Sequence, residues 1–168
     1  MVGAATGRTI ALVAGALLLV TITACSDGDE PDTSDNIVSE GNVAVGTVRV
    51  GDCFDDPPGV FDVGGVTIGS LDAVPCAKAH DNEVFASFQY PADKDAPFPG
   101  DDAVRDFAAG TCLPSFGPYV GRDYETSILD ITWVAPVSRS WRNHREVLCI
   151  LYHVDLQRLR GTMRDSGR

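Results

Sequence analysis

Basic residues are scarce in this 168-residue chain: 13 of them, only two being lysine, stand against 24 acidic residues. The formal net charge of −11 argues against a nucleic-acid partner, because phosphate backbones are bound by basic surfaces. The sequence also lacks a G-x-S-x-G nucleophile elbow, a phosphate-binding glycine loop and a dinucleotide fingerprint. We therefore predict no cofactor and favour a non-enzymatic role, while leaving catalysis open.

The hydrophobic run near the N-terminus is too short to cross a bilayer. Residues 10–20 (IALVAGALLLV) form an apolar stretch of eleven residues, whereas a membrane-spanning helix needs about 20. The stretch follows Arg8 and leads to small residues before Cys25, which is the layout of a signal peptide. We predict an export signal over residues 1–24.

The end of this signal, Ile22-Thr23-Ala24-Cys25, resembles the lipobox of bacterial lipoproteins. The resemblance implies cleavage before Cys25, acylation of this cysteine including palmitate, and the lipid bilayer as a partner. Several acyl chains hold a protein stably on a membrane, so the predicted location is the outer face of the plasma membrane. A secretory signal cut elsewhere and a signal-anchor helix are the alternatives.

The segment after Cys25 is acidic and polar. Ser26 to Glu40 contains six acids and no base, a composition that cannot bury a core. We predict a disordered tether over residues 25–41 and one extracytoplasmic domain over residues 42–168. Its aspartates offer calcium ligands, but their spacing does not give an EF-hand loop.

The domain holds four further cysteines, Cys53, Cys76, Cys112 and Cys149. An exported protein can oxidise them, and three pairings are possible. We favour Cys53–Cys76 and Cys112–Cys149, since each closes a loop that is local in sequence. Zinc is the rival interpretation, but no two cysteines have the close C-x₂-C spacing of a zinc site, so we predict no metal.

Hydrophobic periodicity predicts an α+β fold, with an antiparallel or mixed sheet of about five strands and one main helix. The helix is expected over residues 101–112, ending because Pro114 cannot continue it. The uninterrupted apolar run over residues 145–154 predicts a central strand buried on both faces. Further strands are expected over residues 43–50, 60–74, 83–90 and 127–134.

The densest polar cluster of the domain, the candidate binding set, contains His80, Asp81 and Glu83. These side chains can ligate a metal or transfer protons, but no partner from elsewhere in the chain can be named. We expect His80 to be a hydrogen-bonded structural residue. Trp141 is a further candidate, either lining a groove for a sugar or peptide or packing on its neighbours.

The C-terminal segment is basic. Residues 139–168 hold seven arginines and three acids, a balance of +4. These arginines can meet anionic lipid or cell-wall polymer, or pair with the domain's own acids. We favour the second interpretation.

Several motifs in one order resemble the septum formation domain of actinobacterial membrane proteins and lipoproteins, over about residues 45–165. They are VGDCF at 50–54, VPC at 74–76, HDNEVF at 80–85, Cys112 after a helix, Pro136, Trp141, Arg145 and CIL at 149–151. Ala79 stands where the family commonly has proline, and Asn143 and His144 stand where it tends to have glycine and aspartate. The resemblance implies an extracytoplasmic domain linked to cell division, and no catalytic residue.

The functional hypothesis is therefore a membrane-anchored lipoprotein with a binding or scaffold domain. Its expected partner is an envelope protein or a cell-wall polymer, in septum formation or envelope assembly. The alternatives are a cell-wall hydrolase that uses Asp or Glu, and a lipoprotein that binds a solute or metal.

Overall fold

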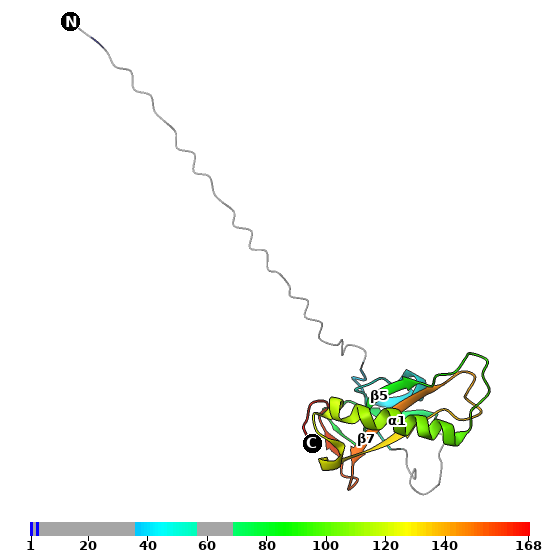
Figure 1. Cartoon of the computed structure of the whole chain (residues 1–168). Helices are drawn as coiled ribbons and strands as arrows, with labels where there is room; N and C mark the ends of the chain where they lie inside the picture. Colours follow the sequence, from blue (N-terminus) through cyan, green and yellow to red (C-terminus); the bar gives the residue numbers. More distant parts are fainter. Residues whose placement is uncertain (2, 4–35, 57–68) are drawn as a thin grey trace. The chain divides into compact units, whose positions relative to one another are not determined.

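The computed structural model describes residues 1, 3, 36–56 and 69–168, and the chain divides into two units, Met1–Asp32 and Thr33–Arg168. The second unit holds every described helix and strand (Figure 1). The export signal, Cys25, most of the acidic tether and residues 60–68 of an expected strand region lie outside the described residues. The expectations for these segments stay predictions.

The second unit has one long helix, α1 (Asp101–Val120), and two short 3₁₀ turns, η2 (Val45–Thr47) and η3 (Tyr124–Thr126). No helix among the described residues has the length and apolar character needed to cross a membrane. The strands are β1 (Gly41–Ala44), β2 (Cys53–Asp55), β3 (Ser70–Val74), β4 (Ala79–His80), β5 (Asn82–Gln89), β6 (Leu129–Val134), β7 (Glu146–His153) and β8 (Leu159–Arg160).

The α+β fold class is confirmed. Six strands form one sheet in the order β1-β3-β2-β5-β7-β6, and every neighbouring pair is antiparallel. The main sheet is thus antiparallel rather than mixed, with six strands where about five were expected. A small second sheet pairs β4 with β8, so that the C-terminal segment lies beside the start of β5.

Strand β7 is a central strand, as its apolar run predicted. It lies between β5 and β6, and both of its faces are buried. Val147, Cys149 and Leu151 face the core on the helix side, whereas Leu148 and Ile150 face the opposite core. The strand therefore shows no polar alternation, because neither of its faces is open to water.

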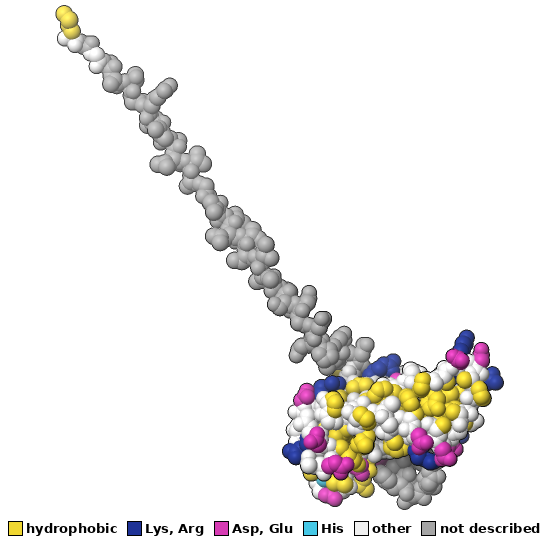
Figure 2. All heavy atoms as spheres, viewed as in Figure 1, with side chains coloured by type: hydrophobic (Ala, Val, Ile, Leu, Met, Phe, Trp, Pro, Cys, Tyr) yellow, Lys and Arg dark blue, Asp and Glu magenta, His cyan; other side chains and the backbone are white. Residues whose placement is uncertain are grey.

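The two cores lie on opposite faces of the sheet. Helix α1 crosses the face formed by β5, β6 and β7 (Figure 1). The view of this side shows hydrophobic side chains interspersed with acidic and basic ones (Figure 2). The helix-side core contains Phe85, Ala108, Cys112, Phe116, Tyr119, Val120, Leu129, Val147, Cys149, Leu151, Leu159 and Met163. The opposite core contains Val48, Phe54, Leu71, Val84, Leu148 and Ile150.

The predicted end of the helix is wrong. Helix α1 continues through Pro114 and Pro118 to Val120. Both prolines are exposed, as is Gly110, so the carbonyl groups that lose an N–H donor can bond to water instead. Beyond the prolines, Phe116 is fully buried, and its packing favours the helix over the break that the local sequence favours.

The strand expected over residues 43–50 is also shorter than predicted. Strand β1 ends at Ala44, and the 3₁₀ turn η2 follows it. The turn closes with a 3.2 Å hydrogen bond from the Val48 amide to the Val45 carbonyl oxygen. It directs Val48 into the core on the side of the sheet opposite the helix, where this side chain is 1% exposed.

The side chains of β5 do not alternate strictly between the two faces of the sheet. Strict alternation along the strand expected over residues 83–90 would place Val84, Ala86 and Phe88 on one face and Phe85 on the other. The structure has a register shift between Val84 and Ala86 against β7. A β-bulge adds one residue to a strand, so Phe85, Ala86 and Phe88 all pack on the helix-side core while Val84 packs on the opposite one.

Both favoured disulfides are confirmed, Cys53–Cys76 and Cys112–Cys149. The second joins the middle of α1 to β7, so it fastens the helix to the sheet within the helix-side core. The first joins the start of β2 to the turn between β3 and β4. The bridge thus holds the segment that leads into the candidate binding residues.

Candidate functional site

The polar residues buried in the described part of the chain lie at one end of the sheet. They are Asp52, His80, Asn82 and Glu83, each at most 4% exposed. Asp52 accepts hydrogen bonds from the amides of Arg49 (2.7 Å) and Ile37 (2.8 Å), so its carboxylate closes the turn before β2. The other three lie in β4 and at the start of β5, and they separate into a buried cluster and a pocket.

The buried cluster is built around Glu83, which is completely shielded from water. The hydroxyls of Tyr119 and Thr162 each donate to Oε1 at 2.5 Å, and the Met163 amide donates to Oε2 at 2.7 Å. A buried carboxylate is costly unless it is satisfied in this way. Burial, and then the charge of Glu83, raise the pKa of the Tyr119 phenol.

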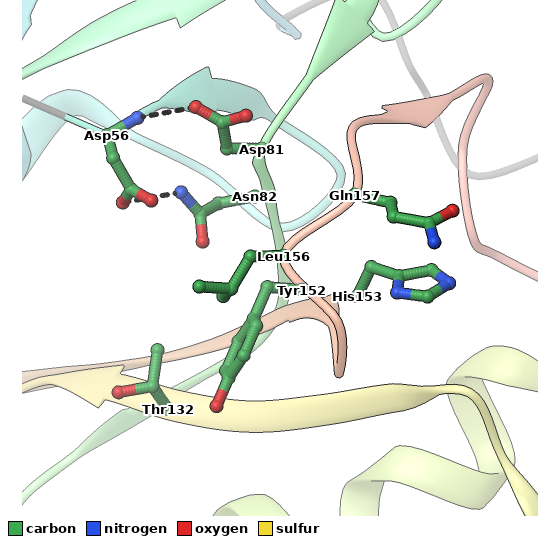
Figure 3. Close-up of a pocket in the computed structure, with 8 residues that line it drawn as sticks. All are labelled: Asp56, Asp81, Asn82, Thr132, Tyr152, His153, Leu156 and Gln157. Atoms are coloured by element: carbon green, nitrogen blue, oxygen red, sulfur yellow. Dashed lines mark hydrogen bonds between the residues drawn. The ribbon is translucent and has the colours of Figure 1, made fainter.

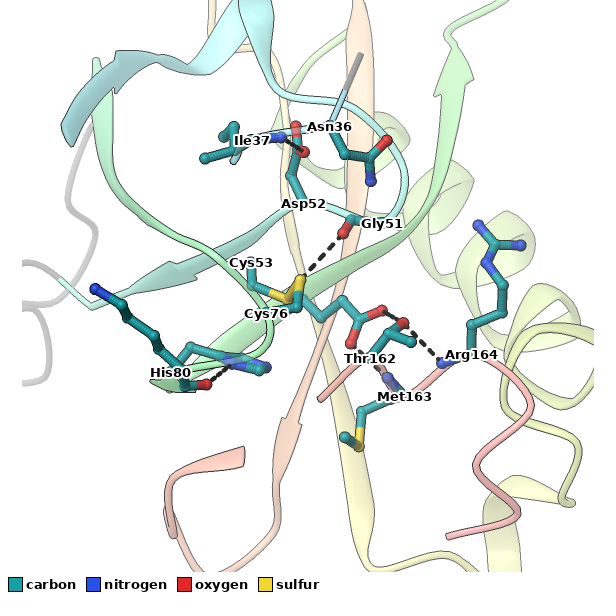
Figure 4. Close-up of a disulfide and its surroundings, with 12 residues drawn as sticks. Asn36, Ile37, Gly51, Asp52, Cys53, Cys76, His80, Thr162, Met163 and Arg164 are labelled. Carbon is teal, nitrogen blue, oxygen red and sulfur yellow. Dashed lines mark hydrogen bonds between the residues drawn. A yellow bond between two sulfur atoms is a disulfide. The ribbon is translucent and has the colours of Figure 1, made fainter. Parts of the chain in front are cut away.

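His80 is completely buried beside the Cys53–Cys76 bridge (Figure 4). One donor atom each from Cys53, His80 and Glu83 lies within 4.8 Å of the others, which makes these residues the candidate metal set of the described chain. The Cys53 sulfur is bonded to Cys76, and Glu83 already accepts three hydrogen bonds. A disulfide sulfur is not a thiolate ligand, so the oxidised trio has only His80 to offer a metal.

The pocket is a cavity of about 270 Å³ at the same end of the sheet (Figure 3). We call it the acidic pocket. Its lining combines carboxylates and amides with an apolar wall. The lining residues are Asp56, Asp81, Asn82, Thr132, Tyr152, His153, Leu156 and Gln157.

Three carboxylates meet at the rim of the acidic pocket. The Asp56 amide donates to Asp81 (3.2 Å), and the Asp81 amide donates to Asp55 (3.2 Å). Arg158 bonds to Asp55 and lies 3.3 Å from Asp81. It is the one basic side chain paired with these acids in the described part of the chain. The rim therefore keeps an excess of negative charge.

The environment of Asp56 disfavours ionisation of its carboxyl group. Partial burial raises its pKa, and the neighbouring charges of Asp81 and Asp55 add to the effect, while a hydrogen bond from Asn82 opposes it. A nearby cation would favour the charged form of Asp56 and reverse this shift. The rim of the pocket thus gains stability from a positive group.

Asn82 presents a free acceptor to the pocket. Its side chain is 4% exposed, and its Nδ2 donates to Asp56 Oδ1 at 2.8 Å. Its oxygen points away from Asp56 into the space above Leu156 (Figure 3), and no described group donates to this oxygen. An amide oxygen that lines a pocket without such a donor is an acceptor that a ligand can use.

Below the rim, Asp130 accepts hydrogen bonds that position the side chain of the pocket residue Tyr152. Tyr124 and Tyr152 donate to its two oxygens at 2.6 Å and 3.1 Å. Partial burial works against ionisation of Asp130, but these donors and the Ile131 amide outweigh it and lower its pKa. The bond to Asp130, followed by burial, raises the pKa of Tyr124 to about 12. Tyr152 is thereby fixed with its ring in the pocket.

The structure separates the residues predicted as a binding set. Asp81 lines the acidic pocket, while its immediate neighbour His80 and Glu83, two residues further along the chain, are buried. The hydrogen bond from His80 Nδ1 to the Lys78 carbonyl oxygen (2.9 Å) gives His80 a structural partner. Neither His80 nor Glu83 reaches water.

Trp141 lies apart from the pocket and is 2% exposed. Its indole N–H donates to Ala96 (2.8 Å), and the Tyr90 and Phe98 rings lie 5.2 Å and 5.5 Å away. Arg145 covers the ring at 4.8 Å. The indole therefore packs against its neighbours and offers no open face to a ligand in this structure.

Asp56, Asn82 and Tyr152 line the pocket although no sequence motif singled them out. Asp56 belongs to a run that the sequence marks as a loop, and its pocket position follows from the pairing of Phe54 with Asn82 across β2 and β5. Tyr152 faces Asn82 across β5 and β7. No local signal in the sequence reveals these pairings.

The arginines of the C-terminal segment contact the domain itself. Arg158 pairs with Asp55 and Asp81, and Arg160 donates to the Ala77 carbonyl oxygen at 3.4 Å. Arg164 lies over the Tyr119 ring at 4.5 Å. Of these three arginines, Arg158 forms ion pairs with acids of the domain, whereas Arg160 contacts a carbonyl oxygen and Arg164 an aromatic ring.

Comparison with known proteins finds one matching family and two curated relatives. The family model described as septum formation matches residues 50–166. A protein of Mycobacterium tuberculosis (strain H37Rv) named "Putative lipoprotein LppN" is 30% identical over 122 residues, which are 70% of this chain. The protein of the same name in Mycobacterium bovis matches to the same extent. The chain spans 62% of the length of these relatives.

No solved structure matches the chain. The family match covers well over half of the sequence, and it includes both disulfides, the Glu83 cluster and the whole acidic pocket. The similarity to a lipoprotein supports an extracytoplasmic place in the cell envelope. The chain belongs to the septum formation family.

Proposed function

We propose that this chain is a lipid-anchored lipoprotein on the outer face of the plasma membrane, and that its domain binds a cationic amino group of an envelope component. The ligand class is an amine-bearing cell-wall peptide, bound during septum formation or envelope assembly. The observation that carries the proposal is the acidic pocket, with its excess of carboxylates and the free Asn82 oxygen.

The chemistry of the lining favours an ammonium ligand. Asp56, Asp81 and Asn82 supply acceptor oxygens at one end of a cavity of about 270 Å³. An ammonium group has three donors and a positive charge, so it can satisfy all three. Leu156 and the Tyr152 ring offer an apolar wall to the methylene groups that carry the amine.

Anchoring is supported by the lipobox at Cys25 and by the similarity to a lipoprotein. The test is a Cys25→Ser variant expressed with its own signal. We expect the unaltered chain in the membrane fraction with an acylated N-terminus by mass spectrometry, and the variant without lipid. An unlipidated mature chain from unaltered cells would contradict the anchor.

Ligand binding is tested by calorimetry of the purified chain with Nα-acetyl-lysine amide and with soluble cell-wall peptides that carry a free side-chain amine. Asp56→Asn and Asp81→Asn should each weaken binding about tenfold, the loss expected for about 1.4 kcal/mol at a charge-assisted bond. Asp106→Asn, exposed on α1, removes the same charge elsewhere and should leave binding unchanged.

A matched neutral ligand separates charge from shape. Nα-acetyl-norleucine amide has the same apolar chain without the amine, and it should not bind. Equal binding of both ligands, or equal losses in all three variants, would rule out recognition of an ammonium group. A septal role is tested separately by a fluorescent fusion, for which uniform envelope fluorescence and normal septa on deletion would count against it.

A further inference from the structure

We propose that the Cys53–Cys76 disulfide is a thiol-exchange site, at which an external dithiol attacks Cys76 and His80 protonates the departing Cys53 sulfur. The other disulfide, Cys112–Cys149, is then a purely structural bridge. This reactivity is independent of ligand binding in the acidic pocket.

The two cysteines of the exchange site differ in exposure. Cys53 is completely buried, whereas Cys76 is partly exposed in the turn before β4. A thiolate from solution can therefore reach Cys76 first. Because a thiolate attacks one sulfur and displaces the other, Cys53 becomes the leaving group.

His80 has an unused ring nitrogen next to that leaving group. Its Nδ1 faces the Lys78 carbonyl oxygen, which can only accept, so Nδ1 carries a proton and Nε2 is the free position of the neutral ring. Nε2 is the one buried side-chain N or O atom without a hydrogen-bond partner in the described part of the chain. The imidazole and the Cys53 sulfur belong to the trio whose donor atoms lie within 4.8 Å of one another.

In the reduced form, each cysteine thiol would have a hydrogen-bond acceptor that the disulfide cannot use. The Cys76 sulfur lies 3.3 Å from the Gly51 carbonyl oxygen, an acceptor that a thiol can use and a disulfide cannot (Figure 4). A free Cys53 thiol has His80 Nε2 as its acceptor. Each of the two thiols would therefore have a hydrogen-bond acceptor beside it.

The Cys112–Cys149 bridge has none of these features. Both of its sulfurs are buried, with at most 1% of either residue exposed, among apolar side chains such as Phe116 and Val147. A thiolate leaving group there would be desolvated, and no described acid stands beside it. The Cys112–Cys149 bridge therefore provides an internal control for the rate at which Cys53–Cys76 is opened.

Reduction of the bridge by a dithiol takes place in two steps. The thiolate of a dithiol bonds to Cys76 Sγ, the Cys76–Cys53 bond breaks, and its electron pair leaves on Cys53. His80 Nε2 takes up the proton that the attacking thiol released to water and passes it to Cys53, which becomes a thiol, so the ring returns to its neutral form. The second thiolate of the same dithiol then attacks its own bound sulfur, so that the dithiol is oxidised and Cys76 leaves as a thiolate that takes a proton from water.

The test treats the folded, unaltered chain with reduced glutathione, traps free thiols by alkylation, and maps each cysteine by mass spectrometry. We expect glutathione on Cys76 and the alkyl group on Cys53. With dithiothreitol, we expect Cys53–Cys76 to open at least tenfold faster than Cys112–Cys149. Glutathione on Cys53, or equal rates for the two bridges, would overturn the proposal.

The role of His80 is tested with His80→Phe, which keeps a buried ring, and His80→Gln, which keeps a donor but is not an acid. Both should slow opening of Cys53–Cys76 about tenfold and leave the rate at Cys112–Cys149 unchanged. Unchanged opening in both folded variants would remove His80 from the mechanism. If a variant does not fold, the position of glutathione on the unaltered chain still decides which sulfur is attacked.

Discussion

The Tyr119 hydroxyl on α1 donates a 2.5 Å hydrogen bond to the Glu83 carboxylate on β5, in a region where Glu83 has no contact with water. Thr162 and Met163, near the C-terminus, donate to the same carboxylate. One buried side chain therefore joins the helix, the sheet and the last segment of the chain. Its removal should affect all three.

Glu83→Ala is expected to destabilise the domain strongly. The substitution leaves the buried Tyr119 hydroxyl and Met163 amide without an acceptor, whereas the exposed Thr162 hydroxyl can bond to water. Unsatisfied buried groups cost about 1–3 kcal/mol each, so we expect a loss of about 3 kcal/mol in the free energy of unfolding. Urea unfolding measures it, with exposed Glu125→Ala as the control; equal stability of the two variants would contradict the structural role of Glu83.

Asp130→Asn should change how stability depends on pH. The folded-state pKa of Asp130 is lowered from 3.8, so its contribution is present above that ordinary value and is lost as the pH falls through the folded-state pKa. We expect the variant to be about 1 kcal/mol less stable at pH 7, with a difference that shrinks in acid. Thermal unfolding between pH 7 and pH 2 checks this, and a constant difference across that range would disprove the linkage.

Gly110→Ala should stabilise α1. Gly110 is exposed in the helix interior, and an added Cβ would have no atom within 4 Å. Alanine is favoured over glycine there by about 0.5–1 kcal/mol. Gly121→Ala is the matched opposite, because Gly121 ends the helix at φ 79° and alanine is strained in that conformation. The same sign of change in both variants would be inconsistent with these backbone assignments.

Arg145→Lys should loosen residues 91–100 without unfolding the domain. The guanidinium donates to the carbonyl oxygens of Ala92, Asp93 and Lys94 and lies over the Trp141 ring. A lysine ammonium cannot reproduce this planar fork. Amide hydrogen exchange should become faster in residues 91–100 and stay unchanged in β7. Equal exchange in this segment would show that Arg145 does not hold it.

Much of the secondary structure was predictable from local patterns. The apolar run over residues 145–154 predicted the central strand β7, and the periodicity before Cys112 predicted the start of α1. The extension of the helix beyond Pro114 was not predictable, because it depends on packing of residues such as Phe116 rather than on local propensity. The bulge at Phe85 was likewise not predictable, because it interrupts the two-residue alternation on which the strand prediction rests.

The candidate site was only partly predictable. The sequence singled out His80, Asp81 and Glu83, but it gave no sign that Asp81 lines a pocket while its neighbours serve the core. The acceptor oxygen of Asn82 and the ring of Tyr152 become visible only once β5 has been paired with β7. Spacing along the chain cannot reveal contacts between residues about 70 positions apart.

The sequence by itself determined the fold class and the family, because periodicity and short motifs are local properties of the chain, and it favoured the two disulfide pairings among three that were possible. Only the tertiary structure decided which polar residues are buried and which remain open to a ligand. The strand order brings Asp56 to Asn82 and Met163 to Glu83. Burial and hydrogen bonding then assign each group its role, since an acid satisfied by three donors supports the core, whereas an acid with few partners can bind a cation.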